Sequence, residues 1–356
     1  MNETFELIAL IGTPFSDKRC RSTDRRLESI YKKAFADRVA LLYLTIHRYP
    51  GWSSALENMF LNLNERRDKT LEVVANLADL LNSFCPNEYA IFKSLKPYPA
   101  TPNDTDVIIF GDKKRFKGVI KHLYSKSYIF HEWAPMQTTL IDPMGKGKTG
   151  KGKKGGIYYI DMYSDISTDY FLYINKRSLN PYVQNIELNG VQIKNVRKEV
   201  ELAIILFHNV FPERTFQLEH FYMPLYHLKE DNFDLDVMIE FAENQKLTRA
   251  VAANLTFVEY IHRKLFGFVP ERIVFLLDRW GRNSQELEKF KARGETTPYM
   301  ISPKTFWLTF YDKIHDKAAF RSLIVQGVHM LNPVFFFDVM RSLKNRFSER
   351  GTYHLE

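Results

Sequence analysis

Cysteine is scarce in this sequence, and its histidines follow no metal-binding pattern. The chain has 2 cysteines among 356 residues, Cys20 and Cys85. They lie far apart and have no second pair with which to form a zinc site, so we expect buried thiols rather than a metal centre or a disulfide. The 10 histidines include no H-E-x-x-H or comparable spacing. Any metal site therefore depends on carboxylates.

Long apolar runs are also missing. No segment approaches about 18 uninterrupted apolar residues, because charged residues or histidine interrupt each candidate. The N-terminus, MNETFELIALIGTPF, places acids ahead of a short apolar run and lacks the basic start of a secretory signal. We therefore expect a soluble, cytoplasmic protein with no membrane partner.

Basic residues outnumber acidic ones, which suits a polyanionic partner such as RNA. The formal charge is +8 and the isoelectric point is near 9.1. Residues 145–156, GKGKTGKGKKGG, contain five lysines and no acid. Such a loop could close over nucleotide phosphates or follow a nucleic-acid backbone, although a flexible hairpin with solvated lysines is equally consistent with it.

The same loop imitates a phosphate-binding P-loop but does not fit one. A P-loop requires G-x-x-x-x-G-K followed by Ser or Thr. The frame that ends in Gly147-Lys148-Thr149 begins with Asp142, and the frame that begins at Gly145 ends in Gly150-Lys151-Gly152. The loop is also expected to join two strands rather than a strand and a helix, so we do not expect a P-loop ATPase.

A D-x-D pair, Asp104 and Asp106, opens an apolar segment. In an extended strand the two carboxylates lie on one face, while Val107 and Ile109 lie on the other. Like charges this close repel unless a proton or a cation lies between them, and a hard divalent ion such as Mg²⁺ accepts carboxylate oxygens. The alternative is a simple turn at Pro102-Asn103-Asp104 ahead of a strand.

The residues before this pair carry a family resemblance. Residues 89–92 are typical of a short buried strand, and Lys93-Ser94 follow it. Nine residues then intervene before Asp104-Thr-Asp106-Val. This arrangement resembles the signature of the nucleotidyltransferase superfamily related to DNA polymerase beta. It is most similar to the poorly characterised group with a Lys-Gly pair and an Asp-x-Asp pair. The resemblance implies a small mixed-sheet core and transfer of a nucleoside monophosphate from an NTP, ATP among them, with Mg²⁺ or Mn²⁺.

The chain departs from the family pattern on the phosphate side. Lys93 replaces the first glycine, and Pro97, Pro99 and Pro102 prevent a regular helix after Ser94. We therefore expect Lys93 or Lys96 to supply positive charge to the phosphates, with Ser94 donating a hydrogen bond to a phosphate oxygen. Alternatively, both lysines are solvated loop residues.

A third carboxylate is required from a neighbouring strand if two metal ions are to be held. Asp161 is the best candidate, because it is an isolated acid within the β-branched and aromatic run of residues 156–163. An edge-strand Asp that faces water is the alternative. The fallback candidates are Asp142, Asp165 and Glu132.

The remaining sequence predicts an α+β fold: a small mixed-sheet nucleotidyltransferase core with N-terminal helices and a large C-terminal helical domain. We expect three parts, residues 1–63, 64–195 and 196–356. The first is helical from residue 23 and broken at Pro50-Gly51, and Asn64 caps a second helix over 65–84. In the core, Asp112 caps a basic helix over 113–124, and strands follow at 128–133, 138–141 and 157–163.

The last part has helical patterns throughout. Asn195 is expected to cap a helix over 196–210, in which His208 either contacts substrate or is a structural, partly buried histidine. Further helices are predicted at 216–228, 237–244, 247–265, 270–280, 284–293, 303–314 and 318–346. Most aromatic side chains here should be core residues; a minority could stack on nucleic-acid bases.

Three functions remain open. The first is a nucleotidyltransferase in which Asp104, Asp106 and Asp161 hold the metal and the acceptor is RNA, a protein or a small molecule. The second is a catalytically inactive module of the same fold that binds RNA or a protein. The third is a basic nucleic-acid-binding protein with an incidental D-x-D pair. The base, the acceptor and the oligomeric state are not specified by the sequence.

Overall fold

A seven-stranded mixed sheet lies at the centre of the computed structural model, which describes residues 2–16, 23–102, 104–143, 158–168 and 170–347. The strand order is β3-β4-β5-β2-β1-β9-β8. The strands are β1 (Tyr89–Phe92), β2 (Asp104–Ile109), β3 (Ile129–Ala134), β4 (Gln137–Ile141), β5 (Tyr159–Tyr163), β8 (Val183–Leu188) and β9 (Val191–Val196). β2 is parallel to β5 and β1 is parallel to β9, whereas the other neighbours are antiparallel. The predicted α+β class with a mixed sheet is confirmed.

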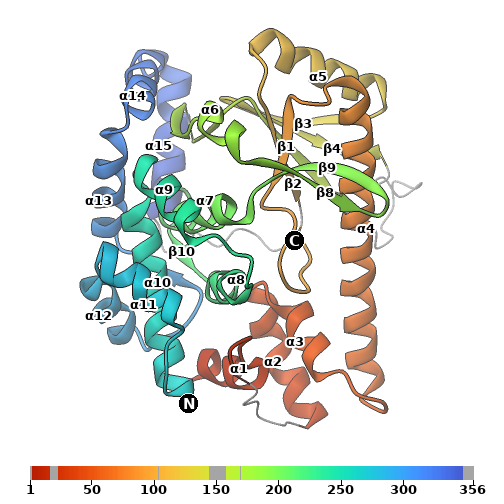
Figure 1. Ribbon diagram of the computed structural model, residues 1–356, viewed down its shortest axis with the longest axis vertical. Coiled ribbons are helices and arrows are strands. Elements are labelled where there is room, and N and C mark those ends of the chain that lie inside the picture. The colour runs from red at the N-terminus through yellow and green to blue at the C-terminus, as the bar shows by residue number, and fades with distance from the viewer. Residues whose placement is uncertain (1, 17–22, 103, 144–157, 169, 348–356) are drawn as a thin grey trace.

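The two faces of this sheet pack against different helices. On one face, α4 (Ser54–Phe84) and α5 (Lys113–Ser125) cover the apolar side chains of β1 and β2 (Figure 1). This layer buries Val73, Leu77, Leu81, Ile91, Val107, Ile109, Phe116 and Val119. On the other face, Ala90, Phe92 and Ile108 join the core around α7 (Lys198–Val210). Since side chains alternate along β2, Asp106 lies on this second face, toward the C-terminal helices.

The N-terminal helices differ from the sequence prediction at one joint. α1 (Glu3–Ile11), α2 (Asp24–Ala36) and α3 (Ala40–His47) precede α4, which is a single helix of 31 residues. Its cap is Ser53, whose hydroxyl accepts from the Leu56 N–H. The expected cap at Asn64 is therefore wrong, because Leu56, Phe60 and Leu63 continue one buried stripe through that position. The expected boundary between residues 63 and 64 falls inside this helix.

A hairpin that the sequence analysis missed extends the sheet. β8 and β9 pair over Val183–Val196, and Asn189 and Gly190 at their turn have φ values of 51° and 78°. Asn-Gly is the preferred pair for such a turn, so the signal was present. Asn195 consequently lies in β9, where it cannot cap the next helix; α7 begins at Lys198 after Arg197.

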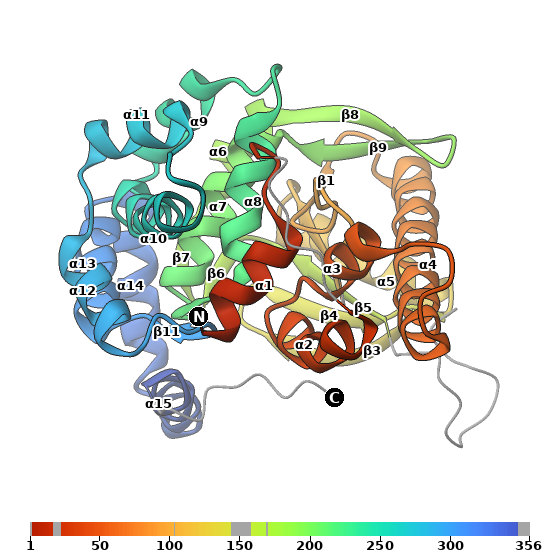
Figure 2. The ribbon, with the colours of Figure 1, turned by 90° about the horizontal axis from the view of Figure 1, so that it is seen from below.

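The C-terminal part is helical (Figure 2), with bounds close to those predicted. It consists of α8 (Leu218–Lys229), α9 (Leu235–Asn244), α10 (Thr248–Phe266), α11 (Glu271–Trp280), α12 (Ser284–Ala292), α13 (Pro303–Ile314), α14 (Lys317–His329) and α15 (Pro333–Phe347), with a short pair β10 (Thr215–Phe216) and β11 (Tyr299–Met300). The expected helix over 318–346 is broken, because Asn332 accepts from the Val334 N–H and Pro333 begins a new helix. A second short pair, β6 (Ile166–Thr168) and β7 (Phe171–Ile174), and the single-turn α6 (Lys176–Leu179) precede β8.

Aromatic and aliphatic side chains of the last helices divide between core and surface. Phe306 is buried, whereas Trp307, Tyr311 and Phe337 are exposed. The outward face of α14 carries Phe320, Ile324 and Val328 at four-residue intervals, and at least half of the surface of each is exposed. Core packing therefore accounts for only part of this aromatic content.

Within the described ranges, no helix by itself has both the length and the apolar character needed to cross a bilayer. Residues Lys317–His329 and Pro333–Arg341 meet that test only as a pair, bent by 117° at their break. Cys85 is a buried free thiol, as expected, and burial raises its pKa to about 11. Cys20 and the lysine-rich loop at 145–156 lie outside the described residues.

Candidate functional site

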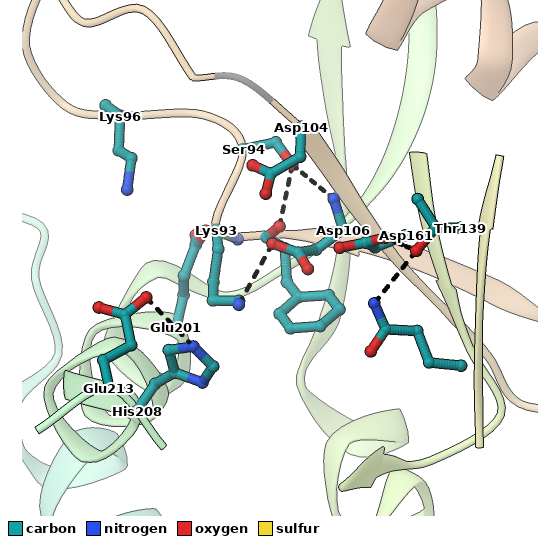
Figure 3. A network of polar contacts seen from close by, with 12 residues as sticks. Lys93, Ser94, Lys96, Asp104, Asp106, Thr139, Asp161, Glu201, His208 and Glu213 are labelled. Carbon is teal, nitrogen blue, oxygen red and sulfur yellow. Dashed lines mark hydrogen bonds and ion pairs between the residues drawn. The ribbon is translucent and has the colours of Figure 1, made fainter. Parts of the chain in front are cut away.

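The predicted carboxylates lie on adjacent strands and on one face of the sheet. β2 and β5 run in parallel with Asp106 directly opposite Asp161, and Asp104 is two residues earlier on β2. The row continues on both sides, because Phe92 on β1 is opposite Asp106 and Thr139 on β4 is opposite Asp161. Figure 3 shows Asp104, Asp106 and Asp161 side by side at this face. The structure thus brings together three acids, although Asp104 and Asp161 are 57 positions apart in the sequence.

Positive charge is limited around two of these acids. Asp104 retains solvent contact at the end of its strand, yet the surrounding protein atoms and the charge of Asp106 raise its pKa to about 6. Burial and the charge of Asp104 also raise the pKa of Asp161, against the hydrogen bond that Thr139 Oγ1 donates to Asp161 Oδ1 at 2.5 Å. Both shifts have the same main cause, burial, to which the charge of a neighbouring carboxylate adds.

Lys93 is the cation nearest to this row. Its Nζ lies 3.2 Å from Asp106 Oδ2, and the two side chains are 15% and 7% exposed. Burial disfavours the ammonium, but the charges of Asp106 and Asp104 outweigh burial and raise the pKa of Lys93 above its ordinary value. The alternative that Lys93 is a solvated loop residue is therefore wrong.

The backbone at Lys93 is held in a conformation that usually favours glycine. Its φ is 60°, in the left-handed region where a side chain costs about 1 kcal/mol. The Lys93 N–H donates to the carboxylate of Glu201, which projects from α7 (Figure 3). Burial raises the pKa of Glu201 to about 7, although Lys96 and the Lys93 N–H oppose that shift. Lys93 thus adopts a glycine-like turn in which its N–H and its ammonium each contact a carboxylate.

Ser94 closes the same turn. Its hydroxyl donates to the Phe92 carbonyl at 3.0 Å and accepts from the Asp106 N–H at 3.1 Å. The side chain is buried and connects the end of β1 to β2 beside the acids. In this arrangement the Ser94 hydroxyl proton is engaged within the turn rather than directed at the position expected for a phosphate.

Lys96 belongs to a second charged group, on the helical side of the site. Its Nζ lies 2.7 Å from Glu219 Oε1, and Arg38 Nη1 lies 3.5 Å from Glu219 Oε2. Arg38 reaches this position because the preceding residue, Asp37, accepts from the Leu218 N–H at the start of α8. Burial opposes ionisation of Glu219, but Lys96, Arg38 and His220 lower its pKa to about 2. Lys96, at 12% side-chain exposure, is not a solvated loop residue either.

His208 completes the helical side. Its Nδ1 lies 2.9 Å from the Tyr173 hydroxyl and its Nε2 lies 3.5 Å from Glu213. Burial and the charge of Lys93 lower the pKa of His208, so a neutral ring with its proton on Nε2 satisfies both partners. Despite burial, the His208 hydrogen bond and the charge of Arg38 hold the pKa of Glu213 well below its ordinary value. Both ring nitrogens are used inside the protein, which favours a structural role.

The fallback acids lie elsewhere or serve other contacts. Asp142 is buried and its charge and hydrogen bond help to raise the pKa of Tyr128. Asp165 accepts from the Lys176 N–H at 3.4 Å. Glu132 is exposed on β3, opposite Thr139.

A recess of about 650 Å³ lies at the turn between α3 and α4. It is lined by Arg48 and Trp52 among others and contains none of the predicted site residues.

Sequence reasoning missed four charged residues that border the acid row: Arg38, Glu201, Glu213 and Glu219. The available signal was that Glu201 and Glu219 interrupt strongly apolar helices, where an acid requires a partner. Arg38 gave no such signal, because it stands between two N-terminal helices.

The donor set has the chemistry of a divalent-metal site but not a closed cage. Within the described part of the chain, no three His, Cys, Asp or Glu side chains converge closely enough to hold a metal ion. Asp106 is turned to Lys93 and Asp161 to Thr139. Three carboxylates lie on one face, two of them with raised pKa values, and carboxylate oxygens are the ligand type that hard divalent cations accept. No family model, no curated protein and no solved structure matches the chain.

Proposed function

We propose that this protein is a metal-dependent nucleotidyltransferase that transfers a nucleoside monophosphate from an NTP to an acceptor hydroxyl, RNA among the candidate acceptors. The observation that carries the proposal is the alignment of Asp104, Asp106 and Asp161 on two adjacent parallel strands. Carboxylates in such a row, on a partly desolvated face, suit Mg²⁺ or Mn²⁺ and a bound triphosphate.

Each residue of the row has a proposed role. Asp104 and Asp106 would hold the ion that accompanies the triphosphate, and Asp161 would share a second ion. Bound metal would supply charge neutralisation on the phosphates and a lower pKa for the attacking hydroxyl. The protein itself contributes position, because β2 and β5 fix the spacing of the acids.

The phosphate side would be formed by side chains rather than by a helix N-terminus. Lys96 and Arg38 converge on Glu219, beside Asp104, and Lys93 stands at Asp106. Their charges act on Asp104, since Lys93, Lys96 and Arg38 each oppose the rise of its pKa. Three cations from two distant segments therefore border the place where phosphate oxygens would meet the metal.

Substitution of the acids tests the proposal. We expect Asp106→Asn, like Asp104→Asn, to reduce transfer of labelled nucleotide by at least about 100-fold, because loss of a metal carboxylate removes several kcal/mol of charge stabilisation. The assay supplies each labelled NTP with total RNA and with the protein itself as acceptors. Circular dichroism and thermal melting check that the variants fold. Unchanged transfer in Asp106→Asn would contradict the assignment.

A second candidate is an inactive module of the same fold that binds RNA or a protein. It is favoured by the internal engagement of Ser94 and Lys93, which leaves the phosphate side without its expected free groups. Calorimetry with each Mg–NTP separates the two. Binding that is lost in Asp104→Asn supports the enzyme, whereas no binding of any NTP supports the module. RNA binding that depends on salt but not on either Asp would instead support a basic nucleic-acid-binding protein.

A further inference from the structure

The ammonium group of Lys93 occupies a position that a metal ion would also require. It lies 3.2 Å from Asp106 Oδ2, and neither side chain has more than 15% of its surface exposed. A carboxylate shielded in this way gains little from water, so it needs a cation when no metal is bound. Lys93 supplies that cation from within the chain.

The backbone fixes this arrangement. Lys93 follows β1 directly, has a φ of 60° and donates its N–H to Glu201. Glu201 is itself buried on α7. The Cα of Lys93 is therefore held at the end of the strand, and the ammonium is joined to it by a four-carbon side chain with several rotatable bonds. A change of rotamer would therefore move the head group without any movement of the strand.

We infer that Lys93 is an internal counter-ion that blocks metal binding to the free site and moves to the phosphates when metal and nucleotide load together. The inference rests on the proposed function. A monovalent ammonium and a divalent ion repel each other when they share one carboxylate. Phosphate oxygens that arrive with the metal offer Lys93 a new partner. Metal alone therefore binds weakly, and the complex of metal and triphosphate binds well.

Lys96 does not share this role, although it is only three residues away. Its ammonium lies 2.7 Å from Glu219, and that carboxylate also pairs with Arg38. Release of Lys96 would leave Glu219 with a poorer partner set, whereas release of Lys93 leaves Asp106 free to accept a metal. The two lysines thus differ in what their carboxylate partners can do next.

Binding of Mn²⁺ alone, measured by electron paramagnetic resonance of the free ion, tests the inference on the full chain. We expect Lys93→Met to bind Mn²⁺ about tenfold more tightly than the wild type, which corresponds to about 1.4 kcal/mol. Lys93→Arg keeps the charge and should remain within about threefold of the wild type. Lys264→Met is the matched control, because it removes an ion-paired lysine whose partner is Glu295, and it should leave Mn²⁺ affinity unchanged.

The outcomes separate this inference from the proposed function. If the wild type binds Mn²⁺, Asp106→Asn does not, and Lys93→Met binds no more tightly than the wild type, the counter-ion role is wrong while the metal site stands. If the wild type binds no Mn²⁺ and also none in the presence of inorganic tripolyphosphate, the proposed function and this inference both fail.

A second measurement avoids dependence on the folding of Lys93→Met. A buried, ion-paired lysine gives an observable ¹⁵Nζ signal, and the signal missing from Lys93→Arg identifies that of Lys93. In the wild type we expect this signal to shift when Mg²⁺ and tripolyphosphate are added together. A signal that stays in place at saturation would show that Lys93 remains on Asp106 and would overturn the inference.

Discussion

Two groups of acids face each other across the site, and their environments differ in one respect. On the sheet, Asp104 and Asp161 have pKa values raised by burial and by neighbouring carboxylates. On the helical side, Glu219 is buried and Glu213 is partly buried, yet their pKa values are lowered, whereas burial raises that of Glu201. The difference is the supply of positive partners, because Arg38, Lys96 and the His208 N–H all serve the helical side.

This difference indicates which acids are available for a cation. Glu213 and Glu219 already have their counter-ions and hold the helical wall together. The acids of the sheet have Lys93 alone among the ion pairs described for them, so an incoming divalent ion would relieve repulsion rather than compete with several partners.

Removing charge from each side should have opposite effects on stability, and this is the largest expected contrast. Glu219→Gln leaves Arg38 and Lys96 without their carboxylate, and we expect a loss of about 3 kcal/mol in the free energy of unfolding at pH 7. Asp104→Asn removes a repelling charge, and we expect an unchanged or higher unfolding midpoint. Urea or thermal unfolding measures both.

A surface pair supplies the control for that contrast. Glu288 is paired with Lys291 on α12 and has 68% of its side chain exposed, so Glu288→Gln should change stability by less than about 0.5 kcal/mol. Equal losses in Glu219→Gln and Asp104→Asn would mean that the two sides of the site do not differ as described.

The pH dependence of these effects sharpens the comparison further. The pKa of Asp104 is about 6 in the folded protein against 3.8 ordinarily, so the folded state binds this proton at a higher pH than the unfolded state does. The destabilisation that the charged Asp104 causes therefore disappears as pH falls from about 6 toward 4. Any gain from Asp104→Asn should therefore be largest at pH 7 and shrink by pH 4.

Glu219 behaves in the opposite way. Its pKa is about 2 in the folded protein against 4.5 ordinarily, so its contribution is complete above pH 4.5 and is lost only as pH falls toward 2. The loss caused by Glu219→Gln should thus persist at pH 5, where the effect of Asp104→Asn is already smaller. Unfolding curves at pH 7, 5 and 4 for the wild type and both variants measure these changes. If the two substitutions changed the free energy of unfolding with the same dependence on pH, the proposed difference between Asp104 and Glu219 would be wrong.

The sequence predicted one side of the site far better than the other. Asp104 and Asp106 were placed on one face by the two-residue period of a strand, and Asp161 by its isolation in an apolar run. These are local patterns. Arg38 reaches Glu219 only because Asp37 contacts Leu218, 181 residues away in the sequence, and no local period encodes such a contact.

Ser94→Ala is expected to have a smaller effect than Glu219→Gln, and it asks whether the turn after β1 is structural or binds phosphate. The hydroxyl joins the Phe92 carbonyl to the Asp106 N–H, so its loss should cost about 1–2 kcal/mol of stability. If that brace is its whole role, Mg–NTP affinity measured by calorimetry should change by less than about threefold at a temperature where the variant is folded. A larger loss of affinity at unchanged stability would show that Ser94 turns to the phosphates. The sheet side would then exchange internal partners for ligand at two successive residues, Lys93 and Ser94, while the helical side keeps its own.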